Sequence, residues 1–248
     1  PDNAARGQPY ITGQYILNDL DTGLPLAIMD STWITEVRTA AATAVAARAL
    51  VAGPPKTIGM LGCGLQARRH MQALTAAFSS IAQVKCYDVV LAAGERYRLE
   101  VMKAHGVDVT VCASARDAFD GCDLVVTTGP IAPDTPRLAE AAWLAPGATA
   151  VTIDYDCYWR PGELARVDRL FTDDIGQLEH TKPDGYFQGM PSSLGEISDV
   201  VAGKRPGRTS PTERIVCINM GIALEDVASA VAVYGRARER GLGVELAI

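Results

Sequence analysis

From residue 56 onward, short runs of β-branched and apolar residues alternate with longer segments of helical spacing. The apolar runs predict β-strands, at residues 57–61, 84–88, 107–111, 123–128, 148–154 and 169–173. The segments between them predict helices, at residues 66–78, 91–105, 114–119 and 136–144. Strands that alternate with helices predict an α/β fold, in which a parallel sheet is covered on both faces.

The first fifty residues follow a different pattern. Residues 10–18 and 24–30 are strand-like and flank the turn sequence D-L-D-T-G, which predicts a β-hairpin. Ser31 or Thr32 is placed to cap a helix through the alanine-rich residues 34–52. Because most side chains of this helix are methyl groups, it can approach its neighbours closely.

The C-terminal segment returns to a simple strand and helix. Residues 206–213 have the composition of a loop, and residues 214–219 predict a strand. Apolar residues at helical spacing then predict a helix over residues 221–240, which Gly241 ends. We expect this strand and helix to pack against the N-terminal hairpin and helix.

Composition and charge argue against several classes of protein. The chain has 248 residues, of which 48% are hydrophobic, and a formal net charge of -6, which argues against a nucleic-acid partner. Its six cysteines form no C-x-x-C pair and it has only three histidines, so we expect no metal site. The apolar run at residues 39–52 carries Arg48, so we expect no membrane span. The buried character of most cysteines predicts free thiols and a cytoplasmic location.

A glycine-rich sequence, G-C-G-L-Q-A, follows the first strand of the alternating block. The first glycine suits a tight turn, and the second allows a pyrophosphate to approach the backbone. The final alanine allows the new helix to pack closely, and the N-terminus of that helix offers free N–H groups to the phosphates. The cofactor-binding candidates in this motif are Gly62, Gly64, Leu65, Gln66 and Ala67.

An acidic residue, Asp88, ends the next predicted strand, 24 residues after Gly64. A carboxylate at this place accepts hydrogen bonds from the ribose hydroxyls of a dinucleotide and repels a 2′-phosphate. The sequence therefore favours NAD(H) over NADP(H) as the cofactor. The alternative interpretation is an aspartate that only ends a surface strand.

Several motifs accompany the glycine turn. Residues 35–41 have the form T-x-x-R-T-x-A and residues 62–67 the form G-x-G-x-Q-A. The hairpin turn at 19–23, P-G-R at 206–208 and G-x-A-x-x-D at 221–226 complete the set. At this spacing the chain resembles the ornithine cyclodeaminase/mu-crystallin family, over essentially all of its length.

The resemblance implies a Rossmann-type doubly wound parallel sheet with a smaller α/β dimerisation domain. It places the NAD-binding domain at residues 55–205, and builds the second domain from residues 1–54 and 206–248. It implies a homodimer and an enzyme that acts at the carbon–nitrogen bond of an amino acid or imine bearing a carboxylate. The family's other members imply two reactions, hydride transfer as in dehydrogenases and imine reductases, and ammonia release as in cyclodeaminases.

The resemblance also implies roles for individual residues. Arg38 matches the family's R-T arginine and is expected to bind the substrate carboxylate, which suits a planar guanidinium group. Thr39 is a candidate contact for a cofactor phosphate or the substrate, and otherwise a hydroxyl on the helix surface. Thr127 and Thr128 end a predicted strand, where they are placed to line the nicotinamide ribose.

The candidates for a catalytic aspartate lie at the end of the fifth predicted strand. Asp156 best matches the family's aspartate beside the substrate amine, where a carboxylate can move the amine proton. Asp154 is the competing candidate, because residues two apart on a strand face the same side. The residues Tyr158-Trp159-Arg160 follow, where the cyclodeaminase pattern runs directly into P-G-K. This departure leaves the substrate open.

A second departure concerns the start of the chain. Family members carry a segment before the equivalent of Tyr10 that supplies a further arginine and a catalytic lysine, whereas the first lysine here is Lys56. We expect that an upstream segment is missing from the chain as given. If the lysine is truly lost, the chain is instead a dinucleotide-binding dimer without turnover.

Overall fold

The computed structural model describes residues 6–8, 11–132, 135–191 and 194–246. The chain forms two compact units: Pro1–Arg38 with Ile222–Ile248, and Thr39–Gly221. The start of the predicted hairpin, residue 10, lies outside the described residues.

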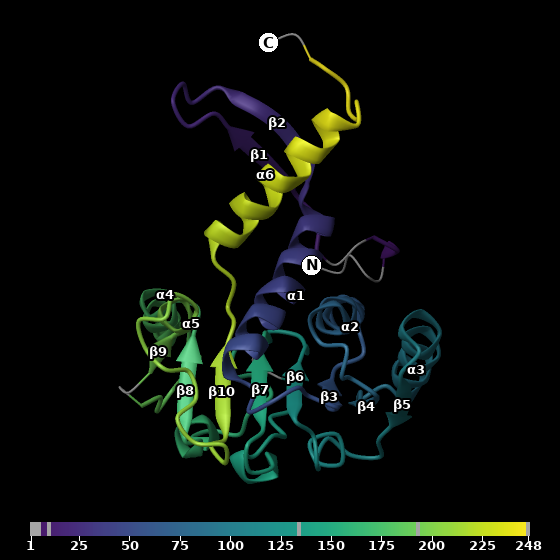
Figure 1. The fold of residues 1–248 in the computed structure, drawn as a ribbon, viewed down its shortest axis with the longest axis vertical. Coiled ribbons are helices and arrows are strands. Elements are labelled where there is room, and N and C mark those ends of the chain that lie inside the picture. Colours follow the sequence, from purple (N-terminus) through teal and green to yellow (C-terminus); the bar gives the residue numbers. More distant parts are fainter. Residues whose placement is uncertain (1–5, 9–10, 133–134, 192–193, 247–248) are drawn as a thin grey trace. The chain divides into compact units, whose positions relative to one another are not determined.

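The larger unit contains an eight-stranded sheet in which all the strands are parallel. Its strand order is β5-β4-β3-β6-β7-β10-β8-β9 (Figure 1). The predicted α/β fold with a parallel sheet is thereby confirmed. The strands are β3 (Thr57–Leu61), β4 (Gln83–Tyr87), β5 (Asp108–Val111), β6 (Leu124–Thr127), β7 (Thr149–Thr152), β8 (Arg169–Thr172), β9 (Gly195–Glu196) and β10 (Ile215–Ile218).

The strand order reverses beside β3. From β3 the chain proceeds outward through β4 to β5, and then crosses to β6 on the other side of β3. At such a reversal the connections leave the sheet in opposite directions, so a crevice opens at the carboxyl ends of β3 and β6. The glycine turn follows β3 directly, at the edge of this crevice.

One face of the sheet is covered by helices. Buried residues of α1, α2 and α3 form a continuous core with alternate residues of the central strands. The other face is covered mainly by turns and short helices rich in aromatic residues, among them Phe119, Trp159 and Phe187. The helices are α1 (Ser31–Leu50), α2 (Leu65–Ala77), α3 (Leu91–His105), η2 (Ala141–Trp143), η3 (Glu163–Arg166), α4 (Ile175–Thr181), η4 (Lys182–Asp184), α5 (Ile197–Val201) and α6 (Ala223–Glu239).

Two predicted helices are wrong. Residues 114–119 form turns, and residues 136–144 are extended apart from the single turn η2. The turns lie flat on the sheet, because the carbonyl oxygen of Ala118 occupies the place where Gly59 of β3 would carry a Cβ atom.

The C-terminal strand also differs from expectation. β10 does not join the N-terminal hairpin but pairs with β7 and β8 inside the large sheet. All four of its residues are buried, as in a strand covered on both faces. The compact units therefore divide at Arg38/Thr39 and Gly221/Ile222, whereas the predicted boundaries fall at 54/55 and 205/206.

The smaller unit contains the predicted hairpin of β1 (Gln14–Asn18) and β2 (Pro25–Asp30), together with α6. α6 contacts β1, and the hydroxyl of Tyr15 donates a hydrogen bond of 2.7 Å to Asp226 Oδ1. α1 begins here, and its first amides donate to the Asp30 carboxylate, at 3.2 Å from both Thr32 N and Trp33 N. The cap is thus Asp30 rather than Ser31 or Thr32.

Among the residues that the structure describes, no helix has the length and apolar character to cross a membrane. All six cysteines are free thiols, and five of them are buried.

Candidate functional site

The turn after β3 requires glycine at its first position. Gly62 has φ of +83°, in the left-handed region that residues with a Cβ atom rarely adopt. A Cβ atom at Gly62 would lie 2.9 Å from the carbonyl oxygen of Thr128. The turn therefore packs directly against the segment that follows β6.

The second glycine leaves the backbone open. Gly64 is the N-cap of α2, and no side chain caps this helix. A Cβ atom at Gly64 would meet no other atom within 4 Å. The absence of neighbouring protein atoms at Gly64 and the N–H groups of the first helical turn suit a phosphate group.

The other residues of the glycine motif differ in how far their side chains are buried. Ala67 is fully buried in the core beneath α2, which explains the need for a small side chain. Leu65 is half exposed at the start of the helix. The amide oxygen Oε1 of Gln66 is buried without a hydrogen-bond partner among the described atoms. An unsatisfied polar atom beside the turn is consistent with a ligand that supplies its partner.

Asp88 lies at the predicted place and links the turn to β4. Its Oδ2 atom accepts a hydrogen bond of 2.8 Å from the N–H of Cys63, and its Oδ1 atom one of 2.8 Å from the N–H of Val90. Each carboxylate oxygen can accept a second hydrogen bond. The carboxylate can thus hold the glycine turn and still accept the hydroxyls of a ribose.

Arg68 is a residue of the turn that the sequence interpretation missed. Its guanidinium group donates hydrogen bonds to the carbonyl oxygens of Cys63, at 2.9 Å, and Gly64, at 2.7 Å, and pairs with Glu100. The side chain therefore ties down the carbonyl groups of the turn and adds positive charge beside Gly64. Its spacing of four residues from Gly64, one helical turn, is the signal in the sequence.

A cavity of about 270 Å³ adjoins the turn. Gly62, Asp88 and Val89 line one side of it, and Gly129 and Tyr158 line the other. Val89 is exposed, and with Asp88 it presents an apolar surface beside a carboxylate, as an adenosine requires. Burial raises the pKa of the Tyr158 hydroxyl, so this group is neutral at physiological pH.

Thr127 and Thr128 lie at the end of β6 and behave differently. The hydroxyl of Thr128 is 3.1 Å from the carbonyl oxygen of Gly62, in the glycine turn. Thr127 is fully buried and donates a hydrogen bond of 2.7 Å to Asp154 Oδ1. The structure thus brings Thr128 to the cofactor turn, whereas Thr127 contacts the competing aspartate.

Asp156 lies apart from the turn. Its Oδ2 atom is 2.9 Å from the guanidinium of Arg137, which also donates to the carbonyl oxygens of Asp156 and Trp159. It lines a separate small hollow beside Trp159 instead of the cavity at Gly62. Its other oxygen, Oδ1, is buried without a partner among the described atoms.

Arg38 belongs to the smaller unit, where two carboxylates of α6 surround it. Its Nη1 atom lies 3.2 Å from Glu225 Oε2. Its Nε atom lies 2.9 Å from Asp226 Oδ1, but without the alignment of a hydrogen bond, so this contact is an ion pair only. A substrate carboxylate at Arg38 would therefore exchange with carboxylates that already hold the guanidinium.

Thr39 lies on α1 in the larger unit, one turn before the buried Thr43. Thr43 forms a hydrogen bond of 2.9 Å to His70 Nε2, and His70 Nδ1 lies 2.7 Å from the carbonyl oxygen of Gln66. Since a carbonyl only accepts, His70 is protonated on Nδ1 and accepts from Thr43. This chain of hydrogen bonds connects α1 to the helix that begins at the glycine turn.

Among the described residues, no group of three His, Cys, Asp or Glu side chains is arranged to hold a metal ion. The features that are present, a glycine turn, an open helix N-terminus and a carboxylate at the next strand end, define a dinucleotide-binding α/β protein. Comparisons with known proteins identify the family. The chain belongs to the ornithine cyclodeaminase/mu-crystallin family, whose model matches residues 1–241.

Relatives of known name and structure agree with this assignment. An alanine dehydrogenase of Archaeoglobus fulgidus is 31% identical over 258 aligned residues, which cover 99% of this chain and 77% of that protein. The structure of an archaeal alanine dehydrogenase dimer with bound NAD superimposes with a TM-score of 0.87 at 30% identity, covering 100% of this chain and 78% of that one. The structure of Δ1-pyrroline-2-carboxylate reductase from Thermococcus litoralis, in complex with NADH and L-proline, superimposes with a TM-score of 0.86 at 27% identity. The match covers 99% of this chain and 78% of that one.

Proposed function

We propose that the chain is an NAD(H)-dependent oxidoreductase that transfers hydride between the nicotinamide ring and the Cα atom of an amino acid or its imine. The observation that carries this proposal is the open backbone at Gly64, next to a carboxylate at the end of the adjacent strand. The relatives named above, an alanine dehydrogenase and a Δ1-pyrroline-2-carboxylate reductase crystallised with NADH and L-proline, support this proposal. NAD supplies the hydride carrier, and the protein supplies binding and orientation.

In the proposed complex the pyrophosphate lies against Gly64 and the first turn of α2, where Leu65 and Gln66 contribute N–H groups. Asp88 accepts the ribose hydroxyls and disfavours NADP(H). Thr128, whose hydroxyl donates to the carbonyl oxygen of Gly62, is a candidate contact for the nicotinamide ribose, as is Thr127. Thr39 is a candidate contact for a cofactor phosphate or the substrate.

For the substrate, we propose that Arg38 binds the carboxylate and that Asp156 moves the amine proton. Both groups are charged and already paired, Arg38 with α6 and Asp156 with Arg137. Each pairing keeps the side chain ordered, and substrate binding would replace one partner by another of the same charge.

A fluorescence titration with NADH tests the cofactor site. We expect Gly64→Val to raise the Kd for NADH roughly a hundredfold, because the new side chain occupies the place of the pyrophosphate and removes the charge-assisted contacts of several N–H groups. Gly53→Val is the matched control, since a Cβ atom at Gly53 also meets nothing within 4 Å but lies outside the turn. If the unaltered chain binds no NADH, or if Gly64→Val binds as well as the control, the proposal fails.

A turnover assay then separates the possible reactions. NADH oxidation with small keto acids plus amines, or with cyclic imines, supports the oxidoreductase. Ammonia release from ornithine without net NADH consumption would instead indicate a cyclodeaminase. NADH binding without turnover of either set would indicate a non-catalytic dinucleotide-binding protein.

We also propose a homodimer that buries the outer face of the hairpin. Ile16 and Ile28 are paired across the two strands and are 62% and 60% exposed, and Leu26 extends the same face. Contiguous apolar surface of this kind is typical of a protein interface. The archaeal alanine dehydrogenase is itself named as a dimer.

The six free thiols support a reducing compartment, so we propose a cytoplasmic location. Fractionation of cells that express the tagged chain tests this directly.

A further inference from the structure

Asp154 is a buried carboxyl group at the carboxyl end of β7 that the proposed reaction does not use. Its side chain is completely buried and has three hydrogen-bond partners. The hydroxyls of Thr127 and Thr152 lie 2.7 Å and 2.6 Å from its Oδ1 atom, and the N–H of Gly129 lies 2.9 Å from its Oδ2 atom. The carboxyl group therefore joins the ends of β6 and β7.

If Asp154 were an ionised carboxylate, the site would hold one proton too few for the short contacts that Thr152 makes. The hydroxyl of Thr152 is 2.6 Å from Asp154 Oδ1 and also 2.6 Å from the carbonyl oxygen of Tyr155. A carbonyl oxygen can only accept, so the one hydroxyl proton of Thr152 belongs in that contact. The short contact to Oδ1 then needs a second proton, which Asp154 itself can provide.

The surroundings favour the neutral form. All three partners of the carboxyl group are uncharged, and among the described residues no ion pair reaches Asp154, in contrast to Asp156. Burial is the largest influence on the pKa of Asp154 and raises it, while the neighbouring hydrogen-bonding groups act in the opposite direction without cancelling the rise. The titratable groups that face Asp154 are Cys157 and Tyr158, and burial raises the pKa of both, so neither is charged at neutral pH.

We infer that Asp154 is a protonated carboxylic acid that positions the Thr127–Pro130 segment as one wall of the cofactor cavity. It donates to Thr152 Oγ1 and accepts from Thr127 Oγ1 and from the Gly129 N–H. It is a positioning residue, because it acts through Gly129 and does not touch the cavity itself.

The packing around Gly129 explains why the position of this segment matters. A Cβ atom at Gly129 would lie 2.9 Å from the Tyr158 ring and 3.2 Å from Asp154 Oδ2. On the opposite side, the carbonyl oxygen of Thr128 lies against Gly62 in the glycine turn. A small displacement of Gly129 would therefore disturb both Tyr158 and the turn that receives the pyrophosphate. This consequence for binding rests on the proposed cofactor site, whereas the protonation state does not.

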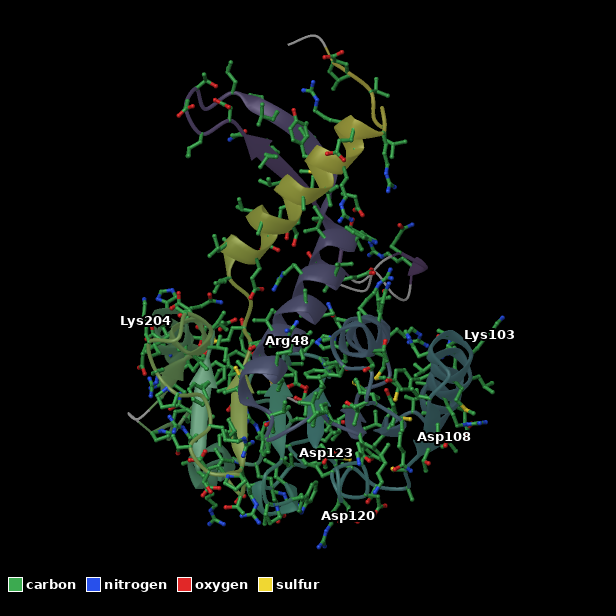
Figure 2. The ribbon with its side chains drawn as sticks, viewed as in Figure 1. Arg48, Lys103, Asp108, Asp120, Asp123 and Lys204 are labelled. Carbon is green, nitrogen blue, oxygen red and sulfur yellow. The ribbon has the colours of Figure 1, made fainter. Side chains whose placement is uncertain are left out.

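Infrared spectroscopy measures the protonation state directly. The difference spectrum between the unaltered chain and Asp154→Asn at pH 7 should contain the C=O stretching band of a protonated carboxyl group. Asp123→Asn is the matched control, since Asp123 is an exposed strand-end aspartate at the opposite edge of the sheet, where it accepts from the N–H groups of Lys56 and Thr57 (Figure 2). Its difference spectrum should lack this band, and the same absence for Asp154 would overturn the inference.

The positioning role is tested by three further readouts. We expect Asp154→Asn to keep the NADH Kd within about threefold, because an amide can donate to Thr152 and accept from Gly129. Asp154→Ala should raise the Kd roughly tenfold or more, since it leaves the buried Gly129 N–H without a partner. In the unaltered chain NADH binding should weaken at alkaline pH as the acid ionises, and in Asp154→Asn this dependence should be absent.

Hydrogen exchange separates failure of this inference from failure of the proposed function. The amide of Gly129 should be protected in the unaltered chain and in Asp154→Asn, and unprotected in Asp154→Ala, whether or not NADH binds. If Asp154→Ala does not fold, the infrared band still tests the protonation state, and the comparison of Asp154→Asn with the unaltered chain still tests the positioning role. Equal protection in all three proteins, or an Asp154→Asn variant as defective as the alanine variant, would reject the positioning role.

Discussion

The two units of this chain bury their strands in opposite ways. In the large sheet, β6, β7 and β10 are buried at every residue, so both faces of these strands lie in a core. In the hairpin, β1 and β2 alternate between half-buried and exposed residues, and the exposed set includes Ile16, Leu26 and Ile28. The larger unit therefore buries its apolar strands in its own core, whereas the smaller unit exposes an apolar face of its hairpin.

Two polar side chains, one from each unit, also lie in different surroundings. His70 in the larger unit is completely buried, and burial lowers its pKa to about 4, so the imidazole is neutral at physiological pH. Arg38 in the smaller unit keeps 16% of its side chain exposed and lies beside the carboxylates of Glu225 and Asp226. One group is thus isolated from charge, whereas the other is surrounded by groups of opposite charge.

The largest effect is expected at the turn of the larger unit. We expect Gly62→Ala to lower the free energy of unfolding by about 3 kcal/mol, since it combines a left-handed residue with a Cβ atom and overpacking against Thr128. Chemical denaturation measures this loss. Gly64→Ala is the control, because φ is −82° and the space is open, so its stability should change by less than about 1 kcal/mol. Equal stability of the two variants would contradict the geometry of the turn.

A similar loss is expected when the interior of this unit is forced to carry charge. Burial lowers the pKa of His70 to about 4, below its unfolded value near 6.5. The stability gained from the neutral imidazole is complete above pH 6.5 and is lost as the pH falls towards 4. The loss amounts to about 3 kcal/mol.

The control is His70→Gln, which cannot take up this proton. Urea denaturation at pH 7 and pH 4.5 should show a smaller difference for this variant than for the unaltered chain. The same slope in both proteins would mean that other groups cause the acid sensitivity.

The ion pair of the smaller unit gives a third test. Arg38→Met should reduce kcat/KM for a substrate with a carboxylate roughly 10- to 100-fold, because a charge-assisted hydrogen bond is lost. Arg48→Met makes the same change on the same helix at an exposed site and should leave kcat/KM unaltered (Figure 2). If the two variants have equal kinetics, Arg38 serves only to hold α6.

The smallest effect concerns the face of the hairpin. Ile28→Lys should raise the dimer dissociation constant roughly tenfold or more, since burial of one isoleucine side chain contributes about 1.5–3 kcal/mol. Leu20→Lys, in the hairpin turn at 98% exposure, should leave association unchanged. Sedimentation equilibrium measures the dissociation constant of each variant. If the unaltered chain is a monomer, the proposed interface does not exist.

Local patterns were sufficient for most of the fold. Apolar runs bounded by turns located every strand of the large sheet except β9, and the bounds of α2 and α3 were recognised within one residue. The short helices α4 and α5 were not predicted. The glycine turn and Asp88 were recognised because each depends on neighbours close in the sequence. The segment at 114–119 was misjudged, because a helical pattern does not reveal that Gly59 admits the carbonyl oxygen of Ala118 against the sheet. The segment at 136–144 was misjudged, because the N–H groups of Leu138 and Ala139 donate to the distant carbonyl oxygen of Tyr158 instead of forming helical hydrogen bonds.

The sequence by itself determined the parallel sheet and the glycine turn, because periodicity and glycine positions are local signals, and its set of motifs carried the resemblance to the family. The tertiary structure alone decided that β10 lies between β7 and β8, that Arg68 supports the turn and that Asp156 pairs with Arg137. It also distinguished two aspartates two residues apart, one completely buried among hydroxyls and an amide, the other beside a guanidinium. Such differences depend on which distant segments surround a side chain, and no spacing along the chain encodes them.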